Sequence, residues 1–310
     1  MTTYVWQNPS SGNWESWFDW SPFNGNFPQA GDTAEVLGSG LTKLNVTHTD
    51  EAANLYVENP NASVNVNGIP ANLYVDNVYD QTAGHVNLIN EGYLYLRGTS
   101  YLQGGNINVG NGSLLLNYGS ILYEEGTSVN MAGGGGIFNA SGSYWDILDN
   151  QGVTQTGASS IVNDGVWEKT GGSGDSRIAG AFQNNGDVFV GVGKLEFRFN
   201  ESGGGTLELF NHASTLQFDR EAAGVLDFTS FGQTVIAKDL YDFHPVIDNF
   251  QSGDTIKISD AWAETNYFYN GTNTIVDLER GGITEAETFA GFVPGIRVHT
   301  GIANTTITHA

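Results

Sequence analysis

The sequence contains no cysteine, and only 11 of its 310 residues are lysine or arginine. The absence of cysteine excludes disulfide bridges and metal sites built from thiolates. The 34 acidic residues outweigh the basic ones and give a formal net charge of −23. A chain with this charge has no basic stripe that could replace the counterions of a nucleic acid, and the same argument disfavours an anionic membrane surface. We therefore expect neither of these as a partner.

Long hydrophobic runs and helical patterns are also missing. No stretch of eighteen apolar residues occurs, so the sequence predicts no transmembrane segment. The opening residues 1–7 carry neither a basic region nor an apolar core, so a cleavable secretory signal is either absent or already removed. Over residues 37–240 no apolar stripe with the periodicity of an α-helix runs for more than two turns. These absences predict an all-β protein.

A repeated strand-like segment is the most informative feature that is present. Residues 54–59 (Asn-Leu-Tyr-Val-Glu-Asn) recur almost unchanged at 72–77, and related segments begin at Tyr93 and Ser113. Regular recurrence of this kind is typical of a solenoid, in which each repeat forms one coil stacked on the last. Residues 37–240 are therefore predicted to form a right-handed parallel β-helix of nine or ten coils; a β-sandwich is the alternative. The expected inward-facing residues are Leu55, Val57, Leu73, Val75, Leu94, Leu96 and Leu115.

A second motif, apolar-x-Asn-x-Gly, marks the corners of the coil. Its asparagines are Asn90, Asn150, Asn163 and Asn184. Glycine accepts a positive φ angle and asparagine tolerates it, so this pair suits a chain that turns repeatedly. The step from Asn150 to Asn163 is too short for a coil and indicates a short rung or a different corner. Asparagine side chains stacked at one corner are expected to bond one another along the axis.

The two ends of the chain differ in composition from the middle. Four of the seven tryptophans, Trp6, Trp14, Trp17 and Trp20, fall in residues 1–36. We predict that this segment caps the first coil, whose apolar interior and strand edges need cover. An aromatic platform for sugar rings is the alternative role. Residues 241–310 are predicted to form a C-terminal β module with a hairpin at Asn270-Gly271.

The ends also carry a family resemblance. Residues Trp6, Trp14, Pro28, Gly31 and Asp32 are similar to the start of exoprotein and autotransporter-passenger repeats. Residues 247–256 (Ile-Asp-Asn-Phe-x-x-Gly-Asp-Thr-Ile) are similar to the C-terminal module of proteins exported by type I secretion. The whole chain resembles acidic bacterial surface proteins with parallel β-helices. The resemblance implies an extracellular protein with an uncleaved C-terminal export signal, often with calcium, although the tandem calcium-binding repeats of that family are missing here.

These features predict an extracellular structural or adhesive protein of a cell surface, matrix or fibre. Self-association and a surface polysaccharide are the expected partners. The alternative is a polysaccharide lyase or hydrolase, or a carbohydrate-binding module. Hydrolases of this shape use paired carboxylates for acid and base catalysis, and the candidates are Asp146, Asp149, Asp164, Glu168 and Asp187, with Trp145 and Trp167 as sugar-stacking partners. Calcium is the expected cofactor, because oxygen-rich turns suit it, and Asp146, Asp149 and Asp254 are its candidate ligands.

Overall fold

The structure is a computed structural model that describes residues 1–310. Strands hold 56% of the residues, and the chain forms about 11 turns of parallel β-solenoid divided between two compact units, residues 1–166 and 167–310. The predicted all-β, parallel fold is confirmed. The helix η1 (Trp17–Asp19) is a short 3-10 turn, and no helix is long and apolar enough to cross a membrane.

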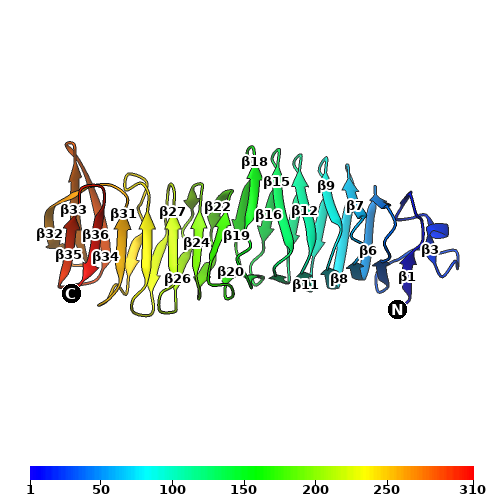
Figure 1. Ribbon diagram of the computed structural model, residues 1–310, viewed down its shortest axis with the longest axis horizontal. Helices are drawn as coiled ribbons and strands as arrows, with labels where there is room; N and C mark the ends of the chain where they lie inside the picture. The colour runs from blue at the N-terminus through cyan, green and yellow to red at the C-terminus, as the bar shows by residue number, and fades with distance from the viewer. The chain divides into compact units, whose positions relative to one another are not determined.

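The strands of the first unit are arranged in three faces, and one turn of the coil contributes to each face in succession. Face 1 contains the first halves of β6 (Thr49–Val57) and β8 (Asn72–Gln81), then β10 (Tyr93–Leu96), β13 (Leu114–Asn117), β16 (Gly136–Asn139) and β19 (Ser160–Asn163). Face 2 contains β1 (Thr3–Trp6), β4 (Thr33–Val36), the second halves of β6 and β8, β11 (Thr99–Leu102), β14 (Ser120–Tyr123) and β17 (Tyr144–Ile147). Face 3 contains β2 (Ser11–Asn13), β5 (Thr42–Val46), β7 (Ala62–Asn67), β9 (His85–Ile89), β12 (Gly105–Gly110), β15 (Thr127–Ala132) and β18 (Val153–Thr156). Figure 1 shows strands β7, β9, β12 and β15 of face 3 side by side.

The core of the first unit consists of apolar columns that run along the coil axis. On face 1, Leu73, Leu94, Leu115, Ile137 and Ile161 stack in register. The sequence interval between consecutive members of this column is the length of one coil. All seven predicted inward residues are at most 1% exposed, so this prediction is confirmed. Burying each leucine contributes roughly 1.5–3 kcal/mol, and this repeated burial stabilises the coil.

The two near-identical hexapeptides lie on different faces and are not stacked on each other. Residues 54–57 belong to face 2 and pair with 78–81, whereas residues 72–75 belong to face 1 and pair with 49–52. The pairing is parallel, as predicted. The second copy begins less than one full coil after the first. It therefore lies on face 1, which precedes face 2 in each turn of the coil. Leu and Val point inward in both copies because strand side chains alternate on every face.

The predicted asparagine ladder is present at one corner of the coil. The side-chain amide of Asn117 donates to Oδ1 of Asn139 at 2.7 Å, and that of Asn139 donates to Oδ1 of Asn163 at 2.7 Å. All three residues are fully buried. Asn150 follows β17 on face 2, whereas Asn163 ends β19 on face 1, so the short step between them joins different corners.

A second asparagine ladder runs along the outer surface of face 3. Each side-chain amide donates to the residue one coil earlier, at 2.8–3.1 Å. Its members are Asn45, Asn65, Asn87, Asn108 and Asn130. They are partly exposed, so water can replace these bonds when one is lost.

Three of the four N-terminal tryptophans pack together in residues 1–36, the segment predicted to act as a cap. Trp6, Trp14 and Trp20 are at most 5% exposed, and Trp20 packs edge-on against both partners at 5.0 and 5.2 Å between ring centroids. Trp17 remains 46% exposed. The short strand β3 (Trp20–Ser21) pairs antiparallel with β1. Because β1 and β2 already pair in parallel with β4 and β5, the ladder begins inside the expected cap, before residue 37.

The second unit also consists of rows of parallel strands, and its last strands pair antiparallel. Strand β20 (Val166–Lys169) begins at the boundary between the units. One parallel row contains β21 (Asp175–Ile178), β24 (Lys194–Phe197), β27 (Thr215–Phe218), β29 (Thr234–Ala237) and β31 (Thr255–Ile258). Another contains β23 (Asp187–Val190), β26 (Thr206–Leu209), β28 (Val225–Phe228) and β30 (Val246–Asp248), while β22 (Ala181–Asn184) pairs with β25 (Glu201–Ser202). The parallel rows therefore extend beyond residue 240, into the expected C-terminal module.

The last strands cover the open edges of those rows. Strands β32 (Ala263–Tyr269), β33 (Asn273–Arg280) and β34 (Ile283–Ala290) form an antiparallel sheet, and β34 pairs with β30. Strand β36 (Thr305–His309) pairs antiparallel with both β31 and β35 (Ile296–Thr300). The predicted hairpin at Asn270-Gly271 joins β32 to β33, and Gly271 has a φ of 98° that glycine tolerates.

Candidate functional site

A row of aromatic side chains runs along the outside of face 1 in the first unit. Tyr74, Tyr93, Tyr95 and Phe138 occupy outward positions of β8, β10 and β16, because strand side chains alternate. Tyr118 directly follows β13, in which Leu116 is the residue in register with Tyr95. We call this set the aromatic row, and its members are Tyr74, Tyr93, Tyr95, Tyr118 and Phe138.

The rings of the aromatic row contact one another from rung to rung. Tyr74 and Tyr95 stack with their centroids 4.3 Å apart and their planes inclined by 22°. Tyr118 continues the stack 6.3 Å from Tyr95 at 13°, and Phe138 follows 6.1 Å from Tyr118. Burial, followed by the neighbouring Tyr74, raises the pKa of Tyr95 above its ordinary value. The hydroxyl group of Tyr95 therefore keeps its proton, and Tyr118 beyond it is 48% exposed.

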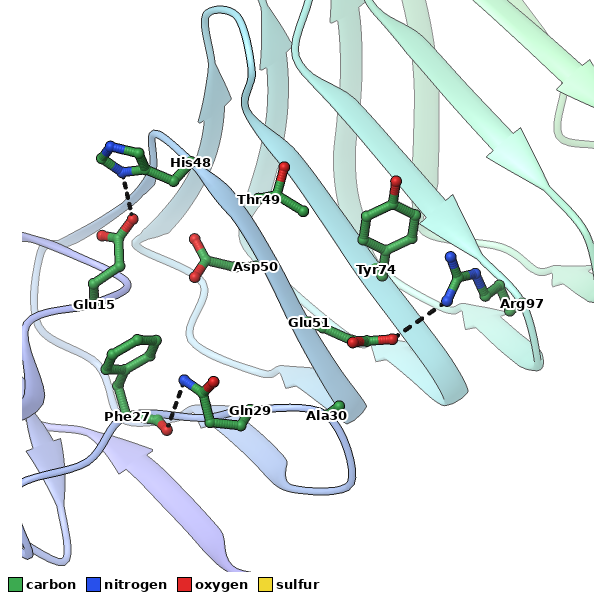
Figure 2. Close-up of a pocket in the computed structure, with 10 residues that line it drawn as sticks. All are labelled: Glu15, Phe27, Gln29, Ala30, His48, Thr49, Asp50, Glu51, Tyr74 and Arg97. Carbon is green, nitrogen blue, oxygen red and sulfur yellow. Dashed lines mark hydrogen bonds and ion pairs between the residues drawn. The ribbon is translucent and has the colours of Figure 1, made fainter.

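An acidic pocket lies beside the first member of the row, where face 1 meets the N-terminal cap (Figure 2). Its volume is about 570 Å³. The residues that line it are Glu15, Phe27, Gln29, Ala30, His48, Thr49, Asp50, Glu51, Tyr74 and Arg97. The cap supplies one side of this pocket and the first rung of face 1 supplies the other.

Asp50 is the most unusual group in the acidic pocket. It occupies an inward position in register with Leu73, and it is only 7% exposed. Its Oδ2 atom has no hydrogen-bond partner. Burial, and then the neighbouring Glu15, raise the pKa of Asp50 to about 7, against a lowering by His48. Nδ1 of His48 lies 2.7 Å from Oε1 of Glu15.

Arg97 connects the acidic pocket to the aromatic row. Its Nη1 atom lies 3.3 Å from Oε1 of Glu51 and 2.9 Å from Oδ1 of Asp76, and Figure 2 shows the contact with Glu51. Its guanidinium carbon lies 4.2 Å from the centre of the Tyr74 ring, a cation–π distance. A hydrogen bond between the side chains of Glu51 and Asp76, and then burial, raise the pKa of Glu51.

The five carboxylates expected to form a catalytic cluster do not line the acidic pocket. In the first unit, Asp146 points outward from β17, Asp149 follows that strand, and Asp164 follows β19. In the second unit, Glu168 points outward from β20, and Asp187 begins β23 near Glu208, whose pKa it helps to raise. The catalytic role of these residues stays a prediction.

The two tryptophans expected to stack on sugars lie inside their coils. Trp145 and Trp167 are fully buried. Trp145 packs edge-on against Tyr123 at 6.0 Å, and Trp167 packs edge-on against Phe182 at 5.4 Å. Because neither ring has an exposed face, the structure does not support a stacking role for them; they fill the core instead.

The candidate calcium ligands have other local contacts. Asp254 is buried and accepts the backbone N–H groups of Gln233 at 3.1 Å and Gln251 at 3.0 Å, so it stabilises its turn. Asp149 accepts the N–H of Asn150 at 2.7 Å. No group of three or more histidine, aspartate or glutamate side chains is placed to hold a metal ion. Calcium stabilisation stays a prediction, and a melting temperature that rises with Ca²⁺ and falls with EDTA would support it.

Neither the aromatic row nor the acidic pocket is among the sites predicted from the sequence. The signal for the row was present, because Tyr74 and Tyr95 are one coil apart and alternate with inward leucines. The pocket has no comparable signal, since Glu15 and Asp50 come from the cap and the coil and meet only through packing.

Comparisons with known proteins identify no family for this chain. The chain matches no protein-family model, and no curated protein is significantly similar to it in sequence. The aromatic row and the acidic pocket are therefore the features that bear on function.

Proposed function

We propose that this protein is an extracellular, carbohydrate-binding β-solenoid with an adhesive role, and that the aromatic row holds a polysaccharide chain. The observation that carries the proposal is the outward stack of Tyr74 and Tyr95 on consecutive rungs, which Tyr118 continues just beyond the end of β13. Tyrosine combines an apolar ring with a hydroxyl group that forms hydrogen bonds. A sugar ring likewise combines apolar C–H surface with hydroxyl groups. Rungs about 4.8 Å apart offer such contacts at a spacing close to the length of one sugar unit.

The charge of the protein favours neutral polysaccharides over acidic ones as ligands. A net charge of −23 repels acidic polymers, and the four carboxylates around Arg97 and His48 make the pocket end of the row acidic. The row itself consists of tyrosine and phenylalanine and contains no acidic or basic residue. Neutral polysaccharides are therefore the proposed ligands.

The extracellular and adhesive parts of the proposal depend on composition and on the resemblance described above. A strongly acidic chain without cysteine suits a surface environment, and an extended row suits attachment to a polymer. In this proposal, adhesion results from the binding of a surface glycan to the aromatic row of one protein molecule.

Replacing Tyr95 by alanine should weaken polysaccharide binding, because this ring is central in the aromatic row and contacts Tyr74, Tyr93 and Tyr118. We expect a loss of about 1–2 kcal/mol, or about 5- to 30-fold in Kd, measured by calorimetry or affinity electrophoresis. Tyr101→Ala is the matched control, since Tyr101 points outward from β11 on face 2. Equal losses for both variants would contradict the proposed site.

One observation favours the enzyme alternative as a second candidate. Asp50 is a carboxylic acid in a pocket, with a pKa of about 7, which suits a general acid. If the protein cleaves polysaccharides there, incubation should release reducing ends, and Asp50→Asn should abolish the release. Binding without any release of reducing ends would favour the adhesive function.

A further inference from the structure

Face 1 begins one rung later than the other two faces, and its first rung has an open strand edge. On face 2, β4 is covered by β1, and on face 3, β5 is covered by β2. On face 1, residues 49–52 of β6 pair with β8 on one side only. An uncovered edge leaves backbone N–H and C=O groups that can pair with another strand.

The acidic pocket lies along this open edge. Thr49, Asp50 and Glu51 all line the pocket, although their side chains alternate between the two sides of the sheet. Three consecutive residues can line one cavity in this way when the cavity follows the edge of their strand. Figure 2 shows Phe27, Gln29 and Ala30 of the cap across from them. The pocket is thus a slot beside an unpaired strand.

The chemistry of the slot specifies the side chain that an added strand would bring. Asp50 occupies a column that is otherwise leucine or isoleucine, and its buried Oδ2 atom has no partner. Glu15 lies close enough to Asp50 to raise its pKa. A strand added in register would place one inward side chain over Asp50. A basic side chain there would supply the missing hydrogen bond and compensate the negative charge.

The chain itself carries a complementary strand. β35 (Ile296–Thr300) is the last strand of its sheet and pairs only with β36. Arg297 and His299 project from the same side of β35, and both are exposed. Only 11 lysine and arginine residues occur in the whole chain, so a basic edge strand is uncommon in this protein.

We propose that the acidic slot is a strand-acceptor site, and that its occupant is β35 of a second copy of this chain. Backbone hydrogen bonds between β35 and residues 49–52 provide the pairing, and Arg297 contacts Asp50 and Glu15. The contact is heterologous, because different surfaces meet, so it repeats from copy to copy and builds a ring or a fibre. This inference does not depend on the aromatic row or on polysaccharide binding.

Sedimentation velocity of the full chain over a wide concentration range, with charge variants, tests the proposal. We expect concentration-dependent association of the wild type. Asp50→Lys and Arg297→Glu should each weaken it at least tenfold, and the chain carrying both changes should regain it. Asp50→Asn serves as a second slot variant that keeps the shape of the side chain, and the melting temperature confirms folding of every variant.

A labelled peptide with the sequence of residues 295–301 provides an independent readout. It should bind the wild type, bind Asp50→Asn at least tenfold more weakly, and compete with self-association. The proposal would be overturned by a chain that stays monomeric at every concentration, or by association that is unchanged in Asp50→Asn and Arg297→Glu. Binding of the peptide to a chain that never self-associates would also overturn it, since the occupant would then be another polypeptide.

Discussion

Replacing Asn139 by alanine should lower the free energy of unfolding by about 3–4 kcal/mol. Asn139 is the central member of the buried ladder: it accepts from Asn117 and donates to Asn163 at 2.7 Å and to the carbonyl oxygen of Val166 at 2.9 Å. Alanine removes all three bonds and leaves one N–H of Asn117 without its acceptor in the core. Urea unfolding measures the loss.

Asn108→Ala is the matched control for this prediction. Asn108 makes the equivalent ladder contacts on face 3, donating to Asn87 at 2.8 Å and accepting from Asn130 at 3.0 Å. It is partly exposed, so water replaces the lost bonds and the expected cost is below about 1 kcal/mol. Equal losses for the two variants would show that burial does not set the contribution of the ladder.

The free energy of unfolding should fall as the pH rises from about 5 to about 9. Burial is the main cause that raises the pKa of three carboxyl groups, Asp50 to about 7 and Glu201 and Glu287 to about 8. The folded protein keeps these protons at pH values at which the unfolded chain has lost them. Their stabilising contribution is complete below the ordinary carboxyl pKa values and is lost as the pH rises through the raised ones.

Glu287→Gln isolates one part of this pH dependence. Glu287 is 1% exposed, and its Oε1 atom has no hydrogen-bond partner, so its charged form is costly in the folded state. Glutamine keeps the shape and cannot ionise. We expect little change in stability at pH 5 and a gain of at least about 2 kcal/mol at pH 9, since one pKa unit corresponds to about 1.4 kcal/mol. A wild type that becomes more stable from pH 5 to pH 9 would contradict this account.

The fold could be predicted because every coil repeats the same alternation of inward apolar and outward side chains. Alternation placed Leu73 and Leu94 inside and implied that Tyr74 and Tyr95 face outward. Asparagine at corners predicted the ladder through Asn163. The register of the first repeats was less accessible, because the second hexapeptide can lie on the same face as the first or on the neighbouring one, and the actual coil length decides between them.

The site could not be predicted to the same extent, for three physical reasons. Spacings of about one coil predict that the candidate carboxylates share one face, whereas Asp146 points outward from β17 on face 2 and Asp164 follows β19 on face 1. Trp145 and Trp167 could equally have pointed outward, and only strand register shows that they fill the core. The acidic pocket required knowledge of how the cap packs against Thr49–Glu51, which no local pattern contains.

Hydroxyl-radical footprinting of the tyrosine side chains, with and without neutral polysaccharides, is the most direct test of the proposed function. Tyr74, Tyr93, Tyr95 and Tyr118 belong to the aromatic row, whereas Tyr56 and Tyr101 point outward on face 2. We expect a bound polysaccharide to protect the four row tyrosines from oxidation and to leave the two face 2 tyrosines unchanged. Unchanged oxidation of the row with every polysaccharide of a broad neutral panel would contradict the account.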